Sequence, residues 1–246
     1  MARWRQQNDL WILPPAGEPR GLIEFIGGSY LAATPQLSYR RLLEALAHQG
    51  WLVHAWNYVP GFDHQSQANE AWRQFRKVRA SERAPAGAGQ RVLRLGHSLG
   101  CKLHLLAPDH GRGSLGLVAL CFNNFSAERS IPLLSELGEQ LQFRSEFSPS
   151  PQATLHQVGA TYLPPRNLLV RFDRDKLDQS ARLLHVLEGR ADDASTLITL
   201  AGDHLTPASA GLRRNLLGSW ADDPSRHRLI NQLAETITTW VSPVKV

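Results

Sequence analysis

The 246-residue chain has few of the features that mark secreted or membrane-spanning proteins. It contains only two cysteines, Cys101 and Cys121, too few for a disulfide framework, and both fit the interior of a protein from a reducing compartment. No apolar run approaches the ~20 residues that cross a bilayer. The apolar residues 10–13 are too few for the core of a signal peptide and end at Pro14. We therefore expect a cytoplasmic protein without a transmembrane segment.

The charge of the chain is basic but carries no clear nucleic-acid signature. The net charge is +5 and the pI is about 9.6. In the densest basic stretch, residues 72–79, apolar groups recur at helical spacing: Trp72, Phe75, and Val78 or the stem of Arg79. This spacing favours an amphipathic helix with a solvated basic face. The weaker alternative is an anionic partner on the face from Arg73 to Arg83, which steep salt dependence of binding would reveal.

Apolar runs alternate with amphipathic segments along most of the chain. We expect strands over residues 22–26, 51–56, 92–95, 115–122, 168–172 and 197–200. We expect helices over residues 36–48, 70–80, 101–106, 178–187 and 226–240. This alternation predicts an α/β fold with a mostly parallel sheet covered on both faces. Residues 4–14 predict an antiparallel hairpin at one edge.

Residues 123–166 interrupt this alternation. They contain no strand pattern, but Leu133, Leu137 and Leu141 recur at helical spacing, and two proline-rich stretches follow. An insertion beyond the end of a strand is where a cap over an active site would lie. A packed helical insertion without a gating role fits equally well. No composition break divides the chain, so we expect one domain over residues 1–246 with a cap insertion at about 123–166.

The pentapeptide Gly96-His97-Ser98-Leu99-Gly100 lies between an expected strand and an expected helix. This is the G-x-S-x-G pattern of a nucleophile elbow, in which a sharp strand-to-helix turn exposes the serine hydroxyl. The turn also directs the Leu99 amide toward the oxyanion that forms on a substrate. Side chains at Gly96 and Gly100 would collide with the neighbouring strand and helix.

A serine nucleophile in such a fold requires an acid and then a histidine further along the chain. His204 is the best candidate base, because it directly follows an expected strand in a turn that Gly202 permits. His185 falls within an expected helix, and His227 lies near the start of the last one.

Three carboxylates follow the strand at residues 168–172, and Asp175 is the best candidate acid because it lies in the turn. Asp173 is close enough to the strand to be part of it. Asp178 is expected to be a helix N-cap. Asp203 is adjacent to His204, and neighbours in the chain rarely point at each other.

The second oxyanion donor should come from the loop after the first central strand. The glycine-containing segment there offers the amides of Gly28 and Ser29, and the sequence does not separate the two. A structural turn that needs positive φ is compatible with the same residues.

A second glycine pattern, residues 111–116, matches G-x-G-x-x-G. It precedes a strand instead of following one, so it lacks the helix N-terminus that holds a pyrophosphate. We expect no dinucleotide cofactor and no metal.

Several spaced blocks of the sequence resemble the α/β-hydrolase superfamily, and within it a cyanobacterial and plastid family catalogued as a domain of unknown function. The blocks are Phe25-Ile26-Gly27-Gly28-Ser29-Tyr30, residues 33–40, residues 96–104, and Gly202-Asp203-His204-Leu205-Thr206-Pro207. The resemblance implies an α/β-hydrolase fold and a cyanobacterial origin. It departs from the superfamily pattern at the oxyanion loop, where Gly27-Gly28 replaces the usual His-Gly.

These observations support two hypotheses. The first is a serine hydrolase that cleaves an ester or thioester of a small, apolar acyl substrate, with Ser98 as nucleophile, His204 as base, Asp175 as its orienting acid, and Leu99 with Gly28 or Ser29 as oxyanion donors. The second is a non-catalytic protein of the same fold that binds a lipid, a pigment or a partner protein. All three triad residue types are present, which favours the first. The sequence does not indicate an oligomeric state.

Overall fold

The computed structural model describes residues 3–29, 31–81, 91–127, 146–208 and 224–242. Its centre is an eight-stranded sheet in the order β1-β2-β4-β3-β5-β6-β7-β8. The strands are β1 (Arg5–Gln7), β2 (Leu10–Leu13), β3 (Gly21–Ile26), β4 (Trp51–Trp56), β5 (Val92–His97), β6 (Ser114–Leu120), β7 (Leu168–Phe172) and β8 (Thr196–Leu200). Strands β3 to β8 are parallel, whereas β1 and β2 form an antiparallel hairpin that pairs with β4. The expected α/β architecture and its edge hairpin are therefore confirmed.

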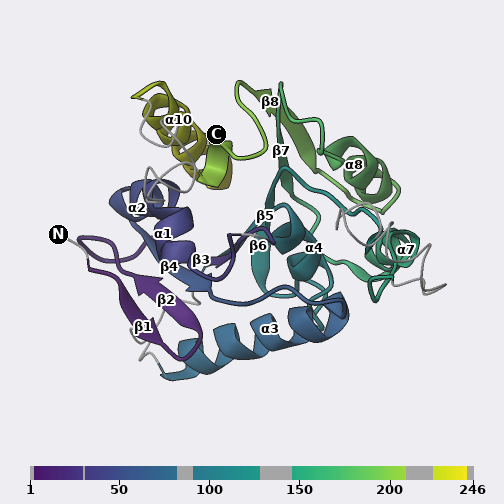
Figure 1. The fold of residues 1–246 in the computed structure, drawn as a ribbon, viewed down its shortest axis with the longest axis horizontal. Coiled ribbons are helices and arrows are strands. Elements are labelled where there is room, and N and C mark those ends of the chain that lie inside the picture. Colours follow the sequence, from purple (N-terminus) through teal and green to yellow (C-terminus); the bar gives the residue numbers. More distant parts are fainter. Residues whose placement is uncertain (1–2, 30, 82–90, 128–145, 209–223, 243–246) are drawn as a thin grey trace, which may run out of the picture.

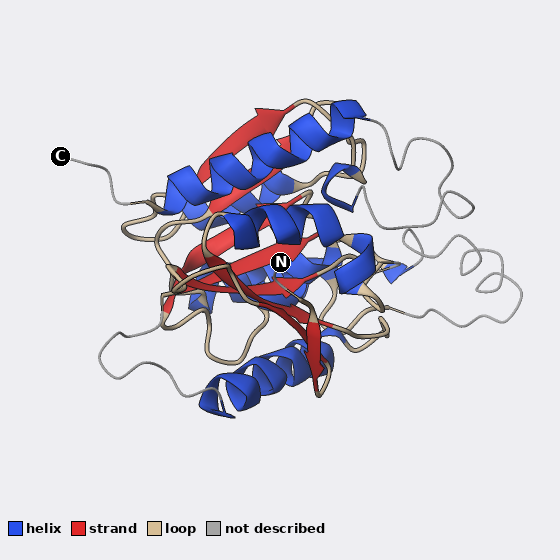
Figure 2. Ribbon diagram, turned by 90° about the vertical axis from the view of Figure 1, so that its left-hand side faces the viewer, coloured by secondary structure: helices blue, strands red, loops and turns tan. Residues whose placement is uncertain are grey.

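Helices cover both faces of the sheet (Figures 1 and 2). The helices are α1 (Pro35–Ser38), α2 (Arg40–His48), α3 (His64–Ser81), α4 (Leu99–Leu105), α7 (Pro151–Thr161), α8 (Ser180–Glu188) and α10 (Pro224–Val241). Figure 1 shows α1, α2 and α10 on one side of the sheet and α4, α7 and α8 on the other. Successive strand side chains point to opposite faces. Ile23 and Phe25 of β3 therefore pack against α2 and α10, whereas Leu22 and Ile26 pack against α3 and α4.

The strand order places one point of the sheet in position to hold a ligand. From β3 the chain first moves outward to β4 and then returns across the sheet to β5 on the other side of β3. Ligands of open α/β sheets bind beyond the carboxyl ends of the strands at such a switch point. The loops that follow β3 and β5 contain Gly28 and Ser98, respectively.

The expected helix over residues 36–48 is wrong in one respect, because it is divided at Tyr39. This residue adopts φ −117° and ψ 16°, so α1 ends before it and α2 begins after it. The Tyr39 side chain is fully buried and packs edge-on against Phe25 at 4.7 Å between ring centroids. Helical periodicity alone does not reveal such an interruption, since the apolar spacing continues through it.

The described parts of the expected helical insertion contain one helix, and it lies outside the leucine pattern that suggested a helix. Helix α7 was not predicted, although Pro151 at its first turn and the Ser150 cap are typical helix-start residues. The leucines expected to form a helix, Leu133, Leu137 and Leu141, lie outside the described residues. Among the residues that are described, no helix is both long and apolar enough to cross a membrane.

The basic helix predicted near residues 70–80 is α3, which begins earlier, at His64. Its Phe75 and Val78 are buried as predicted. Arg79 is not fully solvated, because its guanidinium lies 3.3 Å from the buried Glu24 carboxylate.

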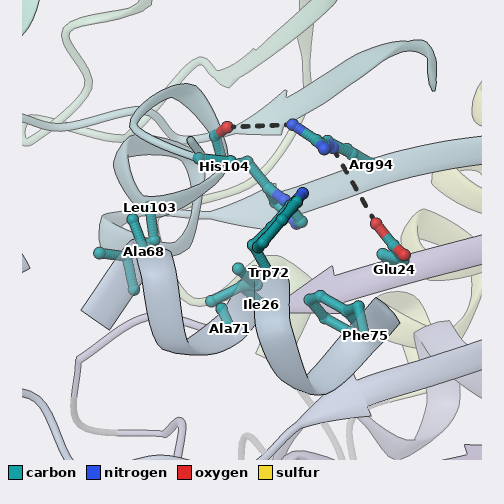
Figure 3. Close-up of a pocket in the computed structure, with 10 residues that line it drawn as sticks. Glu24, Ile26, Ala68, Ala71, Trp72, Phe75, Arg94, Leu103 and His104 are labelled. Atoms are coloured by element: carbon teal, nitrogen blue, oxygen red, sulfur yellow. Dashed lines mark hydrogen bonds and ion pairs between the residues drawn. The ribbon is translucent and has the colours of Figure 1, made fainter. Parts of the chain in front are cut away.

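A small cavity of about 10 Å³ lies between α3, α4 and the sheet (Figure 3). Glu24 and Arg94 extend into it from neighbouring strands, and Arg94 also binds Asp109 at 2.6 Å. Buried charges are stable only when they are paired in this way. The cavity lies under α3 and holds none of the predicted site residues, so the candidate site must be sought at the strand ends.

Candidate active site

Ser98 occupies a strained turn between β5 and α4. Its backbone has φ 54° and ψ −119°, a region that non-glycine residues rarely adopt and that often marks a functional site. The Ser98 amide donates a hydrogen bond to Leu120 O at 2.9 Å, which ties the turn to β6.

The two glycines of the pentapeptide are required by close backbone packing, as predicted. A Cβ on Gly96 would lie 2.6 Å from backbone atoms of Cys101, and one on Gly100 would overlap the carbonyl of Ile26 on β3. The structure therefore places Ser98 in the geometry of a nucleophile elbow.

Asp175 and His204 form a hydrogen-bonded pair at the same edge of the sheet. His204 Nδ1 lies 2.8 Å from Asp175 Oδ2. Asp175 follows β7 and His204 follows β8, and Gly202 between β8 and His204 has φ +143°. The Asp175 carboxylate is fully buried, whereas the His204 side chain is 18% exposed. An acid that is buried behind a partly accessible imidazole is arranged to orient it.

The surroundings of Asp175 keep its carboxylate ionised. Burial acts to raise its pKa, but hydrogen bonds from His204 and the Leu177 amide favour the charged form and lower the pKa below its usual value. A carboxylate that accepts from Nδ1–H leaves Nε2 of a neutral His204 free to accept a proton.

The Ser98 hydroxyl is bound to Asn123, a residue that the sequence did not indicate. Asn123 Nδ2 donates to Ser98 Oγ at 2.8 Å. Asn123 lies just beyond the carboxyl end of β6, the strand next to β5. No hydrogen bond joins Ser98 to His204 among the described residues, although the His204 ring lies 5.1 Å from the ring of His97, the neighbour of Ser98. Such bonds are often absent without substrate and form in the reacting complex.

The geometry distinguishes between the two candidate donors in the loop after β3. The Gly28 amide donates to the Tyr39 hydroxyl at 2.8 Å. The Ser29 amide, in contrast, has no hydrogen-bond partner within the described parts of the chain. Gly28 packs directly on the elbow, since a Cβ there would lie 3.1 Å from Ser98 Cβ. Leu99 is the first residue of α4, where the amide has no acceptor within the helix.

His97 connects the loop after β3 to the loop that contains His204. Its Nδ1 lies 2.8 Å from the Tyr39 hydroxyl, and its Nε2 lies 2.8 Å from the backbone carbonyl of His204. Burial lowers the pKa of His97 to about 3, so its ring is neutral at ordinary pH.

Cys121 lies in the same cluster, and with His97 and His204 it forms a group whose potential metal ligands all lie within 4.8 Å of one another. Several potential ligand atoms of this group already have partners: Cys121 Sγ lies 3.7 Å from the His204 carbonyl, His97 uses both ring nitrogens, and His204 Nδ1 is bound to Asp175. Burial raises the pKa of the Cys121 thiol well above its usual value, so the thiolate that binds metals is disfavoured. Both cysteines are free and buried, as predicted.

The other residues considered from the sequence have local structural roles. Asp173 Oδ1 accepts from the Gly202 amide and so joins the two loops. Asp178 is not the N-cap of α8, because that position is Gln179; its carboxylate instead accepts from the amide and hydroxyl of Ser180. His185 lies within α8, and His227 is an exposed residue in the first turns of α10.

The fold is similar to those of several solved hydrolase structures at low sequence identity. The thioesterase domain from the curacin biosynthetic pathway has 12% identity and a TM-score of 0.58, with 97% of this chain and 98% of that chain covered. Est1E from Butyrivibrio proteoclasticus has 15% identity and a TM-score of 0.58, covering 98% and 99%. S-formylglutathione hydrolase from Staphylococcus aureus has 14% identity and a TM-score of 0.61, covering 98% of each chain. These similarities show an α/β-hydrolase fold.

No curated protein matches the sequence. One family model covers nearly all of it, from residue 3 to residue 243. The chain therefore belongs to the family described as "Protein of unknown function (DUF1350)", and it has the fold of the α/β-hydrolases.

Proposed function

We propose that the protein is a serine hydrolase that cleaves an ester or thioester through Ser98, His204 and Asp175. The observation that carries the proposal is the 2.8 Å hydrogen bond between His204 Nδ1 and the buried Asp175 carboxylate, at the same sheet edge as the strained Ser98 turn. A purely structural role does not require a serine at φ 54° and an oriented imidazole at one edge of the sheet.

The reaction follows from this arrangement. Ser98 Oγ attacks the acyl carbon, and its proton passes to His204 Nε2, where the Asp175 carboxylate stabilises the resulting imidazolium. The amides of Leu99 and Ser29 hold the oxyanion; we choose Ser29 over Gly28 because Tyr39 already occupies the Gly28 amide. Collapse of the tetrahedral intermediate breaks the bond to the alcohol or thiol, which takes the proton from His204. Water then releases the acid by the same steps in reverse order.

Apolar side chains near the triad support an acyl substrate. Leu205 follows His204 directly and is 38% exposed, and Leu177, two residues after Asp175, is 46% exposed. Apolar groups placed beside a reactive centre favour an acyl chain over a charged substrate. The structurally similar proteins include a thioesterase domain and an S-formylglutathione hydrolase by name, which fits the same class. We propose that the chain acts as one domain; within the predicted cap insertion, residues 128–145 lie outside the described residues, and α7 packs against α8.

The proposal is tested by turnover and by covalent labelling. We expect the protein to hydrolyse members of a series of p-nitrophenyl esters and acyl thioesters of increasing chain length, and to react with a fluorophosphonate probe. The Ser98→Ala variant should lose both activities. The matched control is Ser114→Ala, since Ser114 lies at the start of β6, at the opposite end of the strands. A correctly folded wild-type protein that is not labelled would contradict the proposal and favour a binding protein of the same fold.

A further inference from the structure

A continuous chain of buried hydrogen bonds runs behind the candidate triad. It begins at the Gly28 amide, which donates to the Tyr39 hydroxyl at 2.8 Å. It continues from Tyr39 to His97 Nδ1 at 2.8 Å and ends where His97 Nε2 meets the His204 carbonyl at 2.8 Å. This series of hydrogen bonds therefore joins three loops at the edge of the sheet that holds Ser98. They are the loop after β3, which contains Gly28, the turn after β5, and the loop after β8, which contains His204.

We propose that Tyr39 and His97 are positioning residues. They hold the loop that contains His204 and the loop that contains Gly28 and Ser29 in the positions that the reaction at Ser98 requires. This inference rests on the proposed function, because it assigns the two residues a role in that reaction. Neither side chain is placed to touch a substrate: Tyr39 has no exposed surface and His97 is 1% exposed.

The direction of every hydrogen bond in the chain is determined by its ends. The Gly28 N–H can only donate and the His204 carbonyl can only accept. His97 must therefore carry its proton on Nε2 to reach that carbonyl, and its Nδ1 must accept. The Tyr39 hydroxyl accepts from Gly28 and donates its own proton to Nδ1. Every polar atom along this series of hydrogen bonds therefore acts only as a donor or acceptor that its chemistry allows, and none is left without a partner.

Burial keeps this arrangement stable over the ordinary pH range. Removal from water lowers the pKa of His97 to about 3 and raises the pKa of Tyr39 above its usual value. Both side chains therefore remain neutral, and His97 keeps a single proton with one bond donor and one acceptor. A charged His97 would donate from both nitrogens and could not accept from Tyr39.

Local backbone features are consistent with this placement of Tyr39. The helix that would otherwise run from residue 35 to residue 48 is divided at this residue. A Cβ on Gly27 would lie 2.7 Å from the Tyr39 ring, so the ring needs the space that a glycine leaves. The side chain thus reaches from the helix layer to the oxyanion loop, where it fixes the Gly28 peptide.

The Tyr39→Phe variant tests the inference, since it removes only the oxygen in the middle of the chain. We expect the rate of fluorophosphonate labelling and the kcat for ester hydrolysis to fall about 10²-fold, as for a small misplacement of reacting groups, with KM nearly unchanged. The matched control is Tyr162→Phe, because the buried Tyr162 hydroxyl binds Asn167 away from the site. It should retain wild-type rates.

Two replacements of His97 distinguish a positioning role of this side chain from a role in core packing alone. Glutamine can keep an amide donor near the position of Nε2, so His97→Gln should retain more activity than His97→Leu at equal stability. His104 is the control, as it is equally buried and its Nε2 also meets a backbone carbonyl, that of Leu95 at 3.3 Å. His104→Leu should lower the free energy of unfolding without a selective loss of labelling rate.

The ¹⁵N chemical shifts of the His97 ring report directly on the hydrogen bonds that this ring makes. In the wild type, His97 should show the Nε2–H tautomer at pH 7; in Tyr39→Phe the His204 carbonyl should still select this tautomer, but the Nδ1 resonance should shift because Nδ1 has lost its hydrogen-bond donor. Wild-type rates in a folded Tyr39→Phe variant, or an Nδ1–H tautomer of His97 in the wild type, would overturn the inference while Ser98 labelling remained intact. If the wild-type protein were not labelled at all, the proposed function and this inference would both fall.

Discussion

Replacement of Asp175 by asparagine changes the charge at the proposed triad while it keeps the shape of the side chain. The carboxylate accepts from His204 Nδ1 at 2.8 Å and from the Leu177 amide at 2.8 Å. An asparagine has one carbonyl oxygen, and if that oxygen keeps the Leu177 amide, the NH₂ group faces His204. The imidazole must then present a lone pair at Nδ1 and carry its proton on Nε2, where it cannot accept the proton of Ser98. The stabilising negative charge behind the imidazolium is lost as well.

We expect Asp175→Asn to slow acylation by about 10⁴-fold, the loss that follows when a triad aspartate becomes asparagine in a well-studied protease. That factor corresponds to about 5.4 kcal/mol in the activation free energy. The assay is the second-order rate of fluorophosphonate labelling at pH 7, with urea unfolding to show that the variant is folded. A folded Asp175→Asn variant that is labelled at a rate within tenfold of the wild type would refute the assigned role of Asp175.

Three further changes test other parts of the structure. Asn123→Leu removes the hydrogen-bond donor that lies 2.8 Å from Ser98 Oγ. We expect fluorophosphonate labelling to be about tenfold slower, which is the effect of losing one hydrogen bond. An unchanged labelling rate would show that this bond does not affect the reactivity of Ser98. Gly100→Ala should lower the free energy of unfolding in urea by about 2 kcal/mol or more, because its Cβ would overlap Ile26 O, whereas Gly17→Ala, with no atom within 4 Å of the new Cβ, should have little effect. Burial acts to raise the pKa of Asp109, but the Arg94 guanidinium outweighs burial and holds this pKa below its usual value. The pair therefore stabilises the fold fully above the unfolded pKa of about 3.9. This contribution is lost as the pH falls through the lower pKa of the folded state. The difference in unfolding free energy between the wild type and Asp109→Asn should therefore be largest at neutral pH and shrink below about pH 4, and a pH-independent difference would contradict the assignment.

The sequence was sufficient to predict the features that depend on local pattern and chain order. The Gly96–Gly100 pentapeptide specifies its own turn, because steric demands at both glycines act over a few residues. Asp175 and His204 could be placed because the ends of parallel strands meet at one edge of the sheet. The structure brings these two residues into contact and places Ser98 at the same edge.

The remaining site residues depend on contacts that no local pattern encodes. Asn123 meets Ser98 across 25 positions in the chain, and Tyr39 meets His97 across 58. An asparagine after a strand and a tyrosine within helical periodicity are common in any protein, so neither residue type identifies these contacts. The choice between Gly28 and Ser29 likewise required the Tyr39 hydroxyl, which only the folded chain places beside the Gly28 amide.

The central claim is that Ser98 is the nucleophile, and peptide mapping of a phosphonylated protein tests it most directly. The protein would be treated with a fluorophosphonate, digested and analysed by mass spectrometry. We predict a single adduct on Ser98, formed at a rate that Asp175→Asn reduces. An adduct on another residue, or none on a folded protein, would contradict it.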